Sequence, residues 1–421
     1  MNAVELEENI LVLKHFAQLI EQHKERLALA ATDDNWIPWR ANRDQLQRGI
    51  ATLHQYHRNA EQLEGRASLG GVAIFSSYND PLFGTFGMSL GAALLVNGTR
   101  RPIVLKFPSM LGRLSRTFQE IVQGSGDFPN VSISELDGAA FMEHAFQDPS
   151  IGVIQVYGGP WVRKYAGHPA RHRKALRFEG PGNNPAIVHA SAELAAATAK
   201  IVNMGYMMDG QACVVPKRVL VDDRIPAMAF CDRLHEKVAQ LAVGTDPRSD
   251  VAVGPIKNEL VVKRLTEQYE QAVAKGAVCH NWSQERVEID GASGVLIRPA
   301  VFHGVDHSMR IVAEETFGPV LTVMFAPEGE LAQLANCTDY KLTASIFCDQ
   351  DEASALIREV SAAHGMAMIN QTANEVVTLE EGYIGPWGGH GISSFYIGPD
   401  DDWQLQVGAM SLASNFTTKS A

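Results

Sequence analysis

The chain has 421 residues, of which 46% are hydrophobic and 20% are charged, an ordinary globular composition. A chain of this length is expected to form two or three domains rather than a single core. The formal net charge is −12. This charge argues against a nucleic-acid partner, which requires a basic face, and against docking on an anionic membrane surface.

The cysteines and the beginning of the chain also exclude some classes of protein. The five cysteines contain no Cys-x-x-Cys pair, so we expect neither a disulfide framework nor a zinc site, and no metal is predicted. The first twenty residues are acidic and lack the basic start of a signal peptide. No apolar stretch is long enough to span a bilayer. We therefore expect a cytoplasmic protein.

The predicted elements begin with helices and continue as alternating strands and helices. Residues 2–30 and 43–66 have apolar residues at helical spacing. Short β-branched runs then predict strands at 71–76, 102–107, 151–156, 185–189, 217–222, 320–325, 343–347 and 366–370. Between them, helices are predicted at 191–208, 226–242, 256–275 and 351–363. This alternation indicates an α/β fold with parallel sheets.

The last segment, 403–418, reads as an isolated strand. An isolated strand leaves its backbone groups unpaired, so it needs a partner. We expect this strand to pair across a subunit interface.

Phosphate-binding and hydrolase motifs give little support to other functions. No Gly-x-Gly-x-x-Gly follows a predicted strand, and no Walker A sequence is present. One Gly-x-Ser-x-Gly runs from Gly87 to Gly91. It follows poor strand material, which disfavours a nucleophile elbow.

Cys213, in "GQAC", has two interpretations. Most intracellular cysteines are small buried hydrophobes. A thiolate, however, is a strong nucleophile once its proton is removed. Residues and spacing alone leave the two open.

Six blocks of sequence, taken in order from about residue 68, resemble the aldehyde dehydrogenase superfamily. They are "SSYND" with Pro81, "IVLKFPS" (103–109), the region 177–221 with "FEGPGNNP" and "GQAC", "EETFGPVLTVMF" (314–325), "GMAMINQT" (365–372) and "GPWGG" (385–389). The resemblance implies a Rossmann-like cofactor domain at 1–181 and an α/β catalytic domain at 182–390. It also implies a small β oligomerisation element made from 52–66 and the tail 391–421, in a homodimer or homotetramer.

The resemblance assigns three catalytic residues. Cys213 matches the nucleophile, and the amide of Asn79 would stabilise the oxyanion together with the backbone N–H of Cys213. Glu179 matches the general base that activates water. Without the resemblance, Asn79 reads as a turn residue beside Pro81 and Glu179 as a solvated loop acid. Phe83, Met207 and Met208 are candidates for an apolar wall.

The resemblance also implies NAD or NADP as the cofactor. Lys106 and Glu315 match residues that hold ribose hydroxyls, and Phe317 would pack near the nicotinamide ribose. Gly158 and Gly159 fall at the turn before a helix N-terminus under the pyrophosphate. A snorkelling lysine and an ordinary loop acid are the alternatives for Lys106 and Glu315.

Ser109 bears on the choice between the two cofactors. NAD-preferring members of the family often carry glutamate at this position, and a serine removes that charge. If a helix starts here, Arg113 shares a face with Ser109 and could pair with a 2′-phosphate. We therefore expect NADP to be accepted. The alternative is that Ser109 caps a helix and that Arg113 is solvated.

Several positions depart from the family pattern. Gly158-Gly159-Pro160 stands in place of Gly-Ser-Thr, Asn183 in place of a lysine, and Tyr78 in place of a tryptophan. The Asn79 block comes earlier than is typical, which predicts a shortened N-terminal region. The predicted function is oxidation of a small-molecule aldehyde to a carboxylic acid through a cysteine thioester. A coenzyme A-acylating enzyme, or its reverse, and a non-catalytic protein on the same fold are the alternatives.

Overall fold

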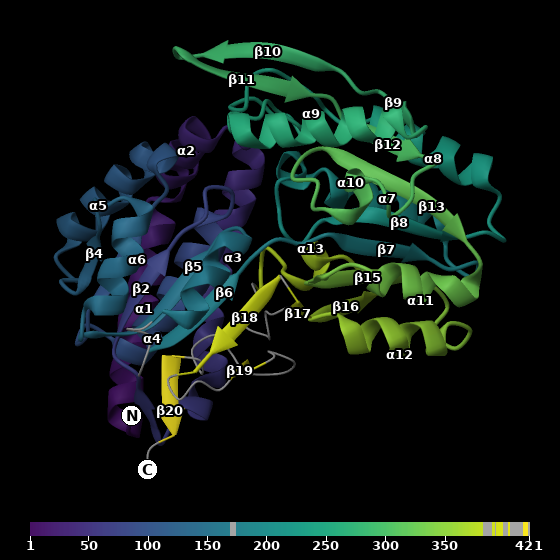
Figure 1. Cartoon of the computed structure of the whole chain (residues 1–421). Coiled ribbons are helices and arrows are strands. Elements are labelled where there is room, and N and C mark those ends of the chain that lie inside the picture. The colour runs from purple at the N-terminus through teal and green to yellow at the C-terminus, as the bar shows by residue number, and fades with distance from the viewer. Residues whose placement is uncertain (169–173, 382–389, 392, 399–402, 405–415, 420–421) are drawn as a thin grey trace.

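The computed structural model describes residues 1–168, 174–381, 390–391, 393–398, 403–404 and 416–419. The chain forms two lobes, each built on a seven-stranded sheet (Figure 1). All eight predicted strands are confirmed, and they are divided between the two sheets.

The first sheet has the order β19-β18-β6-β5-β2-β3-β4. Its parallel strands are β2 (Gly71–Phe75), β3 (Ile103–Lys106), β4 (Val131–Ile133), β5 (Ile151–Tyr157) and β6 (Ala175–Glu179). The late strand β18 (Ser394–Ile397) runs antiparallel to β6, and β19 (Trp403–Gln404) runs antiparallel to β18. Strands β2, β5 and β6 are almost wholly buried, as expected for a sheet that helices cover on both faces.

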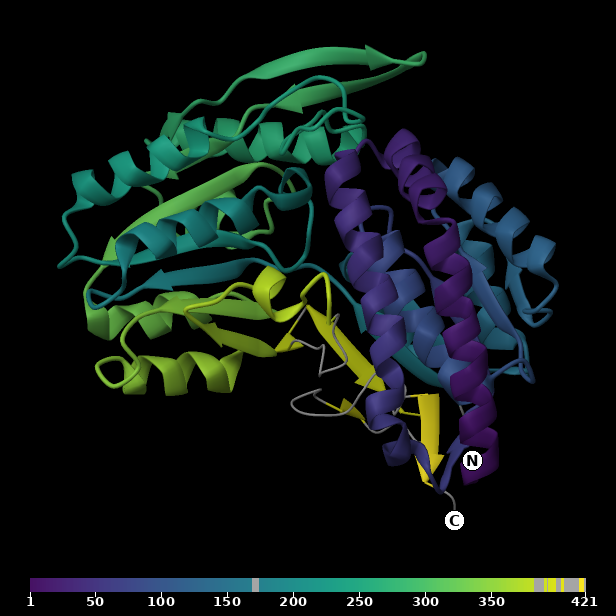
Figure 2. The same ribbon diagram turned by 180° about the vertical axis from the view of Figure 1, so that it is seen from behind.

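Helices cover both faces of this sheet. One face carries α1 (Ala3–Gln22), α2 (Lys24–Asn35), α3 (Trp39–Gln55), the 3₁₀ helix η1 (Tyr56–Leu63), the π-helix η2 (Pro81–Leu90), α4 (Gly91–Asn97) and α5 (Gly112–Ser125), which follows the 3₁₀ turn η3 (Ser109–Leu111). The other face packs against α6 (Gly138–Gln147) and the 3₁₀ helix η4 (Pro160–Gly167). Figure 2 shows α1 and α3 lying side by side.

The N-terminal helices differ from their predicted bounds. The helix expected at 2–30 is broken at His23 and continues to Asn35, where Trp36 adopts a left-handed φ of 60°. The helix expected at 43–66 begins four residues earlier and changes to 3₁₀ geometry after Gln55. Ser89 of the Gly-x-Ser-x-Gly lies inside η2, with its hydroxyl 2.7 Å from the Tyr157 hydroxyl, so no nucleophile elbow exists there.

The second sheet has the order β16-β15-β7-β8-β13-β12-β9. The strands are β7 (Asn184–Val188), β8 (Pro216–Asp222), β9 (Val278–His280), β12 (Ala300–His303), β13 (Val320–Ala326), β15 (Thr343–Phe347) and β16 (Met366–Ile369). Neighbouring strands are parallel except at the edge, where β9 runs antiparallel to β12. A hairpin of β10 (Gln284–Ile289) and β11 (Ala292–Ile297) and a short pair of β14 (Tyr340–Lys341) and β17 (His390–Gly391) lie outside this sheet.

Helices also cover both faces of the second sheet. Helices α7 (Leu194–Gly205) and α8 (Ala227–Ala239) pack on one face, and α9 (Glu259–Ala274), α10 (Arg310–Ala313), α11 (Glu328–Asn336) and α12 (Ser354–Ala363) pack on the other. The 3₁₀ turn η6 (Met207–Gly210) and α13 (Ala373–Val376) border the first lobe. Within the described ranges, none of the helices is both long and apolar enough to cross a bilayer.

The end of the chain pairs within the chain itself. Strand β20 (Thr417–Lys419) lies antiparallel to β1 (Arg66–Ser68), and the Arg66 Nε donates to the Thr417 Oγ1 at 2.5 Å. This pair overlaps the predicted strand at 403–418 only at residues 417–418, so the expected pairing across a subunit interface stays a prediction. Residues 405–415 of that predicted strand and the "GPWGG" block lie outside the described residues.

Candidate active site

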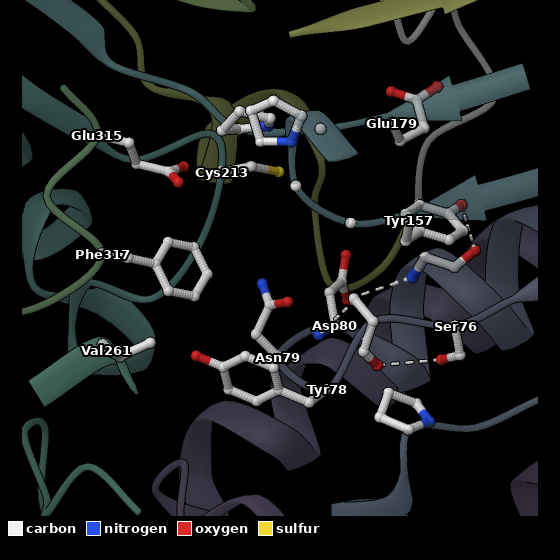
Figure 3. Close-up of a pocket in the computed structure, with 18 of the residues that line it drawn as sticks. Ser76, Tyr78, Asn79, Asp80, Tyr157, Glu179, Cys213, Val261, Glu315 and Phe317 are labelled. Atoms are coloured by element: carbon white, nitrogen blue, oxygen red, sulfur yellow. Dashed lines mark hydrogen bonds between the residues drawn. The ribbon is translucent and has the colours of Figure 1, made fainter. Parts of the chain in front are cut away.

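The two lobes meet at the carboxyl ends of β2, β5 and β6, where parallel α/β sheets commonly bind ligands. A cavity of about 440 Å³ opens there (Figure 3). It brings together most of the predicted site residues, namely Asn79, Gly158, Gly159, Glu179, Cys213, Glu315 and Phe317.

Cys213 lies on the loop between η6 and β8 and is half-buried. Burial raises the pKa of its thiol well above the ordinary value, and the carboxylates of Asp80, Glu315 and Glu179 raise it further. The thiol is therefore protonated at rest, and a base must remove its proton before it can attack a carbonyl.

The loop before Cys213 is held in an unusual conformation. Met208 and Asp209 both have left-handed φ values, of 57° and 58°. The buried Asp209 carboxylate accepts from the backbone N–H of Gly254 at 2.7 Å. Such backbone strain costs free energy and persists only where the surroundings enforce it, which is consistent with a loop that must present Cys213 to the cavity.

Asn79 is directed at the same loop. Its side-chain amide donates to the backbone carbonyl of Gln211 at 2.9 Å, while the Tyr78 hydroxyl donates to the Gln211 Oε1 at 2.8 Å. Figure 3 shows the amide pointing toward the side of the cavity from which Cys213 enters. One amide N–H is thus anchored and the other is available to an oxygen near the thiol.

Glu179 ends β6 and is 6% exposed, so it is not a solvated loop acid. Its Oε1 accepts from the Arg177 Nε at 3.0 Å and from the Arg177 Nη2 at 2.5 Å. Its Oε2 is buried and has no hydrogen-bond partner among the described residues. Burial raises the pKa of the carboxyl, while Arg177 acts in the opposite direction. A carboxylate with one oriented and one unpartnered oxygen can accept a proton from water.

Glu315 and Phe317 precede β13. The buried Glu315 carboxylate accepts from the backbone N–H of Gly182 at 2.8 Å. Burial raises its pKa to about 7, against the lowering effects of that hydrogen bond and of Arg264. The Phe317 ring packs edge-on against Tyr78, with centroids 6.2 Å apart. Tyr78 thus contacts both Phe317 and the Gln211 loop from the position where the family has a tryptophan.

The glycine turn after β5 forms another part of the wall. The Gly158 N–H donates to the Glu179 backbone carbonyl at 3.0 Å, and η4 begins at Pro160. A Cβ at Gly158 would lie 3.1 Å from the Trp161 ring, which is tighter than ordinary contact. The Trp161 side chain itself lines the cavity and is 43% exposed.

Lys106 and Ser109 do not line the cavity, although Pro108 between them does. Lys106 is half-buried at the end of β3, and burial lowers its pKa while Asp137 raises it. Ser109 is exposed and starts η3. The Arg113 guanidinium donates to the Asp33 Oδ2 at 3.0 Å. Arg113 is thus paired with an acid, and its side chain is also 53% exposed to solvent.

A second cavity, of about 50 Å³, also borders Cys213. It shares Asn79, Asp80, Phe83 and Cys213 with the large cavity. Its remaining wall is mostly apolar and consists of Met204, Met207, Met208, Ala212, Val214, Ala373 and Val377 with the polar Gln45, Arg48 and Asn374. The predicted apolar wall of Phe83, Met207 and Met208 is found here.

Asp80 lines both cavities, and sequence reasoning missed it. It precedes η2 and accepts from the Gly84 N–H at 3.2 Å. Burial raises its pKa to about 7, while its backbone hydrogen bonds and Arg48 oppose the shift. In the sequence, Asp80 stands between Asn79 and Pro81, and an acid in that position is typical of a turn, so it gave no sign of a functional role. Arg48 was also missed, because no motif in the α3 sequence indicates a functional residue. Its Nε donates to the Val377 carbonyl at 2.7 Å.

Comparison with known proteins identifies the family. The model of the "Aldehyde dehydrogenase family" matches residues 1–402. The chain therefore belongs to the aldehyde dehydrogenase family.

Two curated relatives have names that specify aromatic aldehydes. The chain is 32% identical to a vanillin dehydrogenase of Pseudomonas fluorescens over 277 residues, which cover 64% of this chain and 55% of the relative. It is 29% identical to a benzaldehyde dehydrogenase of Bacillus subtilis over 316 residues, which cover 73% of this chain and 61% of the relative. The matches thus span between half and two thirds of these relatives.

The fold has close counterparts among solved structures. Aldehyde dehydrogenase C of Pseudomonas syringae, crystallised with NAD⁺ and octanal, superposes with a TM-score of 0.83 at 23% identity, covering 98% of this chain and 83% of that one. This likeness confirms the predicted α/β, aldehyde dehydrogenase-like fold.

Proposed function

We propose that the protein oxidises an aldehyde to a carboxylic acid with NAD or NADP as the oxidant. The observation that carries this proposal is the position of Cys213, where a larger cavity that contains carboxylates meets a smaller, mostly apolar cavity. Two reactants can then reach one thiol, each from its own cavity. The family membership and the names of the relatives support this reaction class.

The first step is attack by the sulfur of Cys213 on the aldehyde carbon. The proton of the thiol passes to a base in the cavity, and the carbonyl oxygen becomes an oxyanion. The amide of Asn79 and the backbone N–H of Cys213 donate hydrogen bonds to that oxygen, which is the usual way to stabilise such charge. The nicotinamide, when bound, accepts the hydride that leaves the former aldehyde carbon.

The second step releases the acyl group from sulfur. Water attacks the thioester carbon, the C–S bond breaks, and the carboxylic acid leaves. Glu179 accepts the proton of this water on its unpartnered Oε2, while Arg177 holds Oε1 in place.

The large cavity has groups suited to a dinucleotide. The Glu315 carboxylate can accept hydrogen bonds from a ribose diol, the Phe317 ring offers an apolar face to the ribose, and the backbone of Gly158 and Gly159 allows close approach of a pyrophosphate. The exposed Ser109 beside Pro108 carries no negative charge that would repel a 2′-phosphate.

The narrow cavity indicates the class of aldehyde. Three methionines, a phenylalanine and two valines dominate its wall, and such side chains favour an apolar body. We therefore propose an aldehyde with an aromatic or aliphatic body, its carbonyl at Cys213.

The test is a panel of aromatic and aliphatic aldehydes with NAD or NADP, each with and without coenzyme A, read by absorbance of the reduced cofactor. The expected result is cofactor reduction without coenzyme A and release of the free acid. Turnover that requires coenzyme A would instead establish the acylating reaction. No reduction with any aldehyde, together with unaltered Cys213, would support the non-catalytic alternative. Size determination of the purified protein tests the proposed homodimer or homotetramer.

A further inference from the structure

Three histidines from separate elements converge at the β9 edge of the second sheet. They are His235 on α8, His280 on β9 and His303 on β12. The Nε2 atoms of His235 and His303 lie 2.9 Å apart, and one ring nitrogen of each histidine lies within 4.8 Å of the others. None of the three lines the cavities around Cys213.

Burial lowers the pKa of two of the three histidines, His303 and His235. Burial lowers the pKa of His303 to about 4, and the two neighbouring imidazoles lower it further. Burial and His280 also lower the pKa of His235, while Asp232 raises it. Cys231, next to Asp232 on α8, contacts the His303 ring, and burial raises the pKa of its thiol. A neutral imidazole keeps the lone pair that a metal requires.

The spacing of the rings fits metal coordination. Zinc–nitrogen bonds of about 2.0–2.1 Å in a tetrahedral site place two ligand nitrogens roughly 3.3–3.4 Å apart. The distances here, from 2.9 Å to at most 4.8 Å, bracket that value. The other nitrogen of His303, Nδ1, lies 3.6 Å from the Cys231 sulfur. Metal-bound histidines commonly have a partner at that second nitrogen, because it fixes the orientation of the ring.

A second cluster in the described part of the chain shows a contrasting arrangement. His189, Asp222 and Glu328 also gather their ligand atoms within 4.8 Å of one another. There, however, the Arg224 guanidinium bonds to the Asp222 Oδ2 at 2.5 Å and to the Glu328 Oε2 at 2.9 Å. The chain itself thus supplies the cation for that cluster. The three-histidine cluster contains only imidazole nitrogens, with no carboxylate or guanidinium among the grouped ligand atoms.

We propose that His235, His280 and His303 form a binding site for a divalent transition metal, with Zn²⁺ as the preferred ion. Cys231 orients His303 from behind and is not a ligand. The ion joins α8 and β12 to β9, an edge strand of three residues. Its role is to stabilise this edge of the sheet, remote from the thiol chemistry.

The decisive experiment measures zinc binding by the full chain in a Cys213→Ala background, which removes the reactive thiol as a competing ligand. Calorimetry and metal analysis after dialysis are expected to give one zinc per chain, and zinc is expected to raise the Tm. Adding His303→Gln should weaken zinc affinity at least about tenfold, since the loss of an outer-shell partner alone costs that much. The matched control His57→Gln, at an exposed histidine of η1, should leave affinity unchanged.

Two further measurements keep the proposal falsifiable. If His303→Gln does not fold, the exposed His280→Gln variant must show the same loss of zinc. Cobalt bound in place of zinc should give tetrahedral ligand-field bands without a thiolate charge-transfer band, and Cys231→Ser should retain those bands. Zinc affinity that is unchanged in both histidine variants, or a thiolate band that Cys231→Ser abolishes, would overturn the assignment.

Discussion

The two cavities that meet at Cys213 differ in size and in chemistry. The large one, about 440 Å³, has the acids Glu179 and Glu315 and a glycine turn in its wall, whereas the small one, about 50 Å³, is lined mainly by methionine and other apolar side chains. Of the two, only the large cavity is lined by Glu315 and the glycine turn, the groups proposed to bind the cofactor. On the proposed function, the cofactor and the aldehyde would occupy different cavities that share one thiol.

The largest effect is expected where the cavities coincide. Cys213→Ala should abolish cofactor reduction with every aldehyde, because no other group can form the thioester. Cofactor binding, measured by fluorescence titration, should persist. Cys337→Ser, at an exposed cysteine, is the matched control and should retain activity. Near-normal turnover in Cys213→Ala would refute the mechanism.

Glu179→Gln tests the wall of the large cavity. General-base assistance is worth roughly 10²–10⁴-fold, so steady-state turnover should fall by about that factor. A burst of reduced cofactor equal to the active sites should remain, and mass spectrometry should find an acyl group on Cys213. An unchanged steady-state rate would contradict the role of Glu179.

Met207→Ala tests the small cavity alone. Loss of apolar contact should lower kcat/KM for aldehydes by about 10–200-fold, the range for small changes in an apolar pocket. The KM for the cofactor should stay as it is. If the cofactor KM changes and the aldehyde KM does not, the assignment of the two cavities is reversed.

Asp80→Asn tests the group that borders both cavities. The Asp80 carboxylate raises the pKa of the Cys213 thiol, so its removal should shift the alkaline rise of kcat/KM to lower pH, by about one unit for each 1.4 kcal/mol of lost repulsion.

Because the pKa of Asp80 is raised to about 7 on folding, the folded state binds this proton more tightly. The free energy of unfolding of the wild type should therefore fall as the pH rises from about 4 to about 7. Denaturant titrations should show a smaller fall for the variant.

The smallest effect is expected at Ser109, which follows the cavity residue Pro108 but does not itself line the large cavity. Ser109→Glu places a like charge near a 2′-phosphate at an exposed site, where charge interactions amount to about 1 kcal/mol. NADP use should weaken several-fold relative to NAD, measured as the ratio of kcat/KM values. A wild type that rejects NADP, or an unchanged ratio in the variant, would count against the expected NADP tolerance.

Much of the fold is readable from the sequence because buried parallel strands give continuous apolar runs. The eight strand segments carry that signal, and all eight are confirmed. The break at His23 lacks a proline or glycine to mark it. The pairing of β18 with β6 joins segments about 200 residues apart, and no local pattern encodes such a partner.

From the sequence, only those site residues could be predicted that lie within the sequence blocks resembling the family. Asn79, Glu179, Cys213, Glu315 and Phe317 stand in such blocks, and one cavity gathers them. Arg48 and the three-histidine cluster come from separate elements with no diagnostic spacing. The prediction of no metal rested on the spacing of cysteines, which carries no information about such histidines.

The antiparallel pairing of β18 with β6 sets an order of events during synthesis. Ser394 of β18 lies opposite Glu179, the residue proposed to release the product. The first lobe emerges from the ribosome early, yet the outer edge of β6 stays unpaired until residues 394–397 have been synthesised, and unpaired edges favour aggregation. The nascent chain therefore contains its proposed general base long before the sheet around that base is finished.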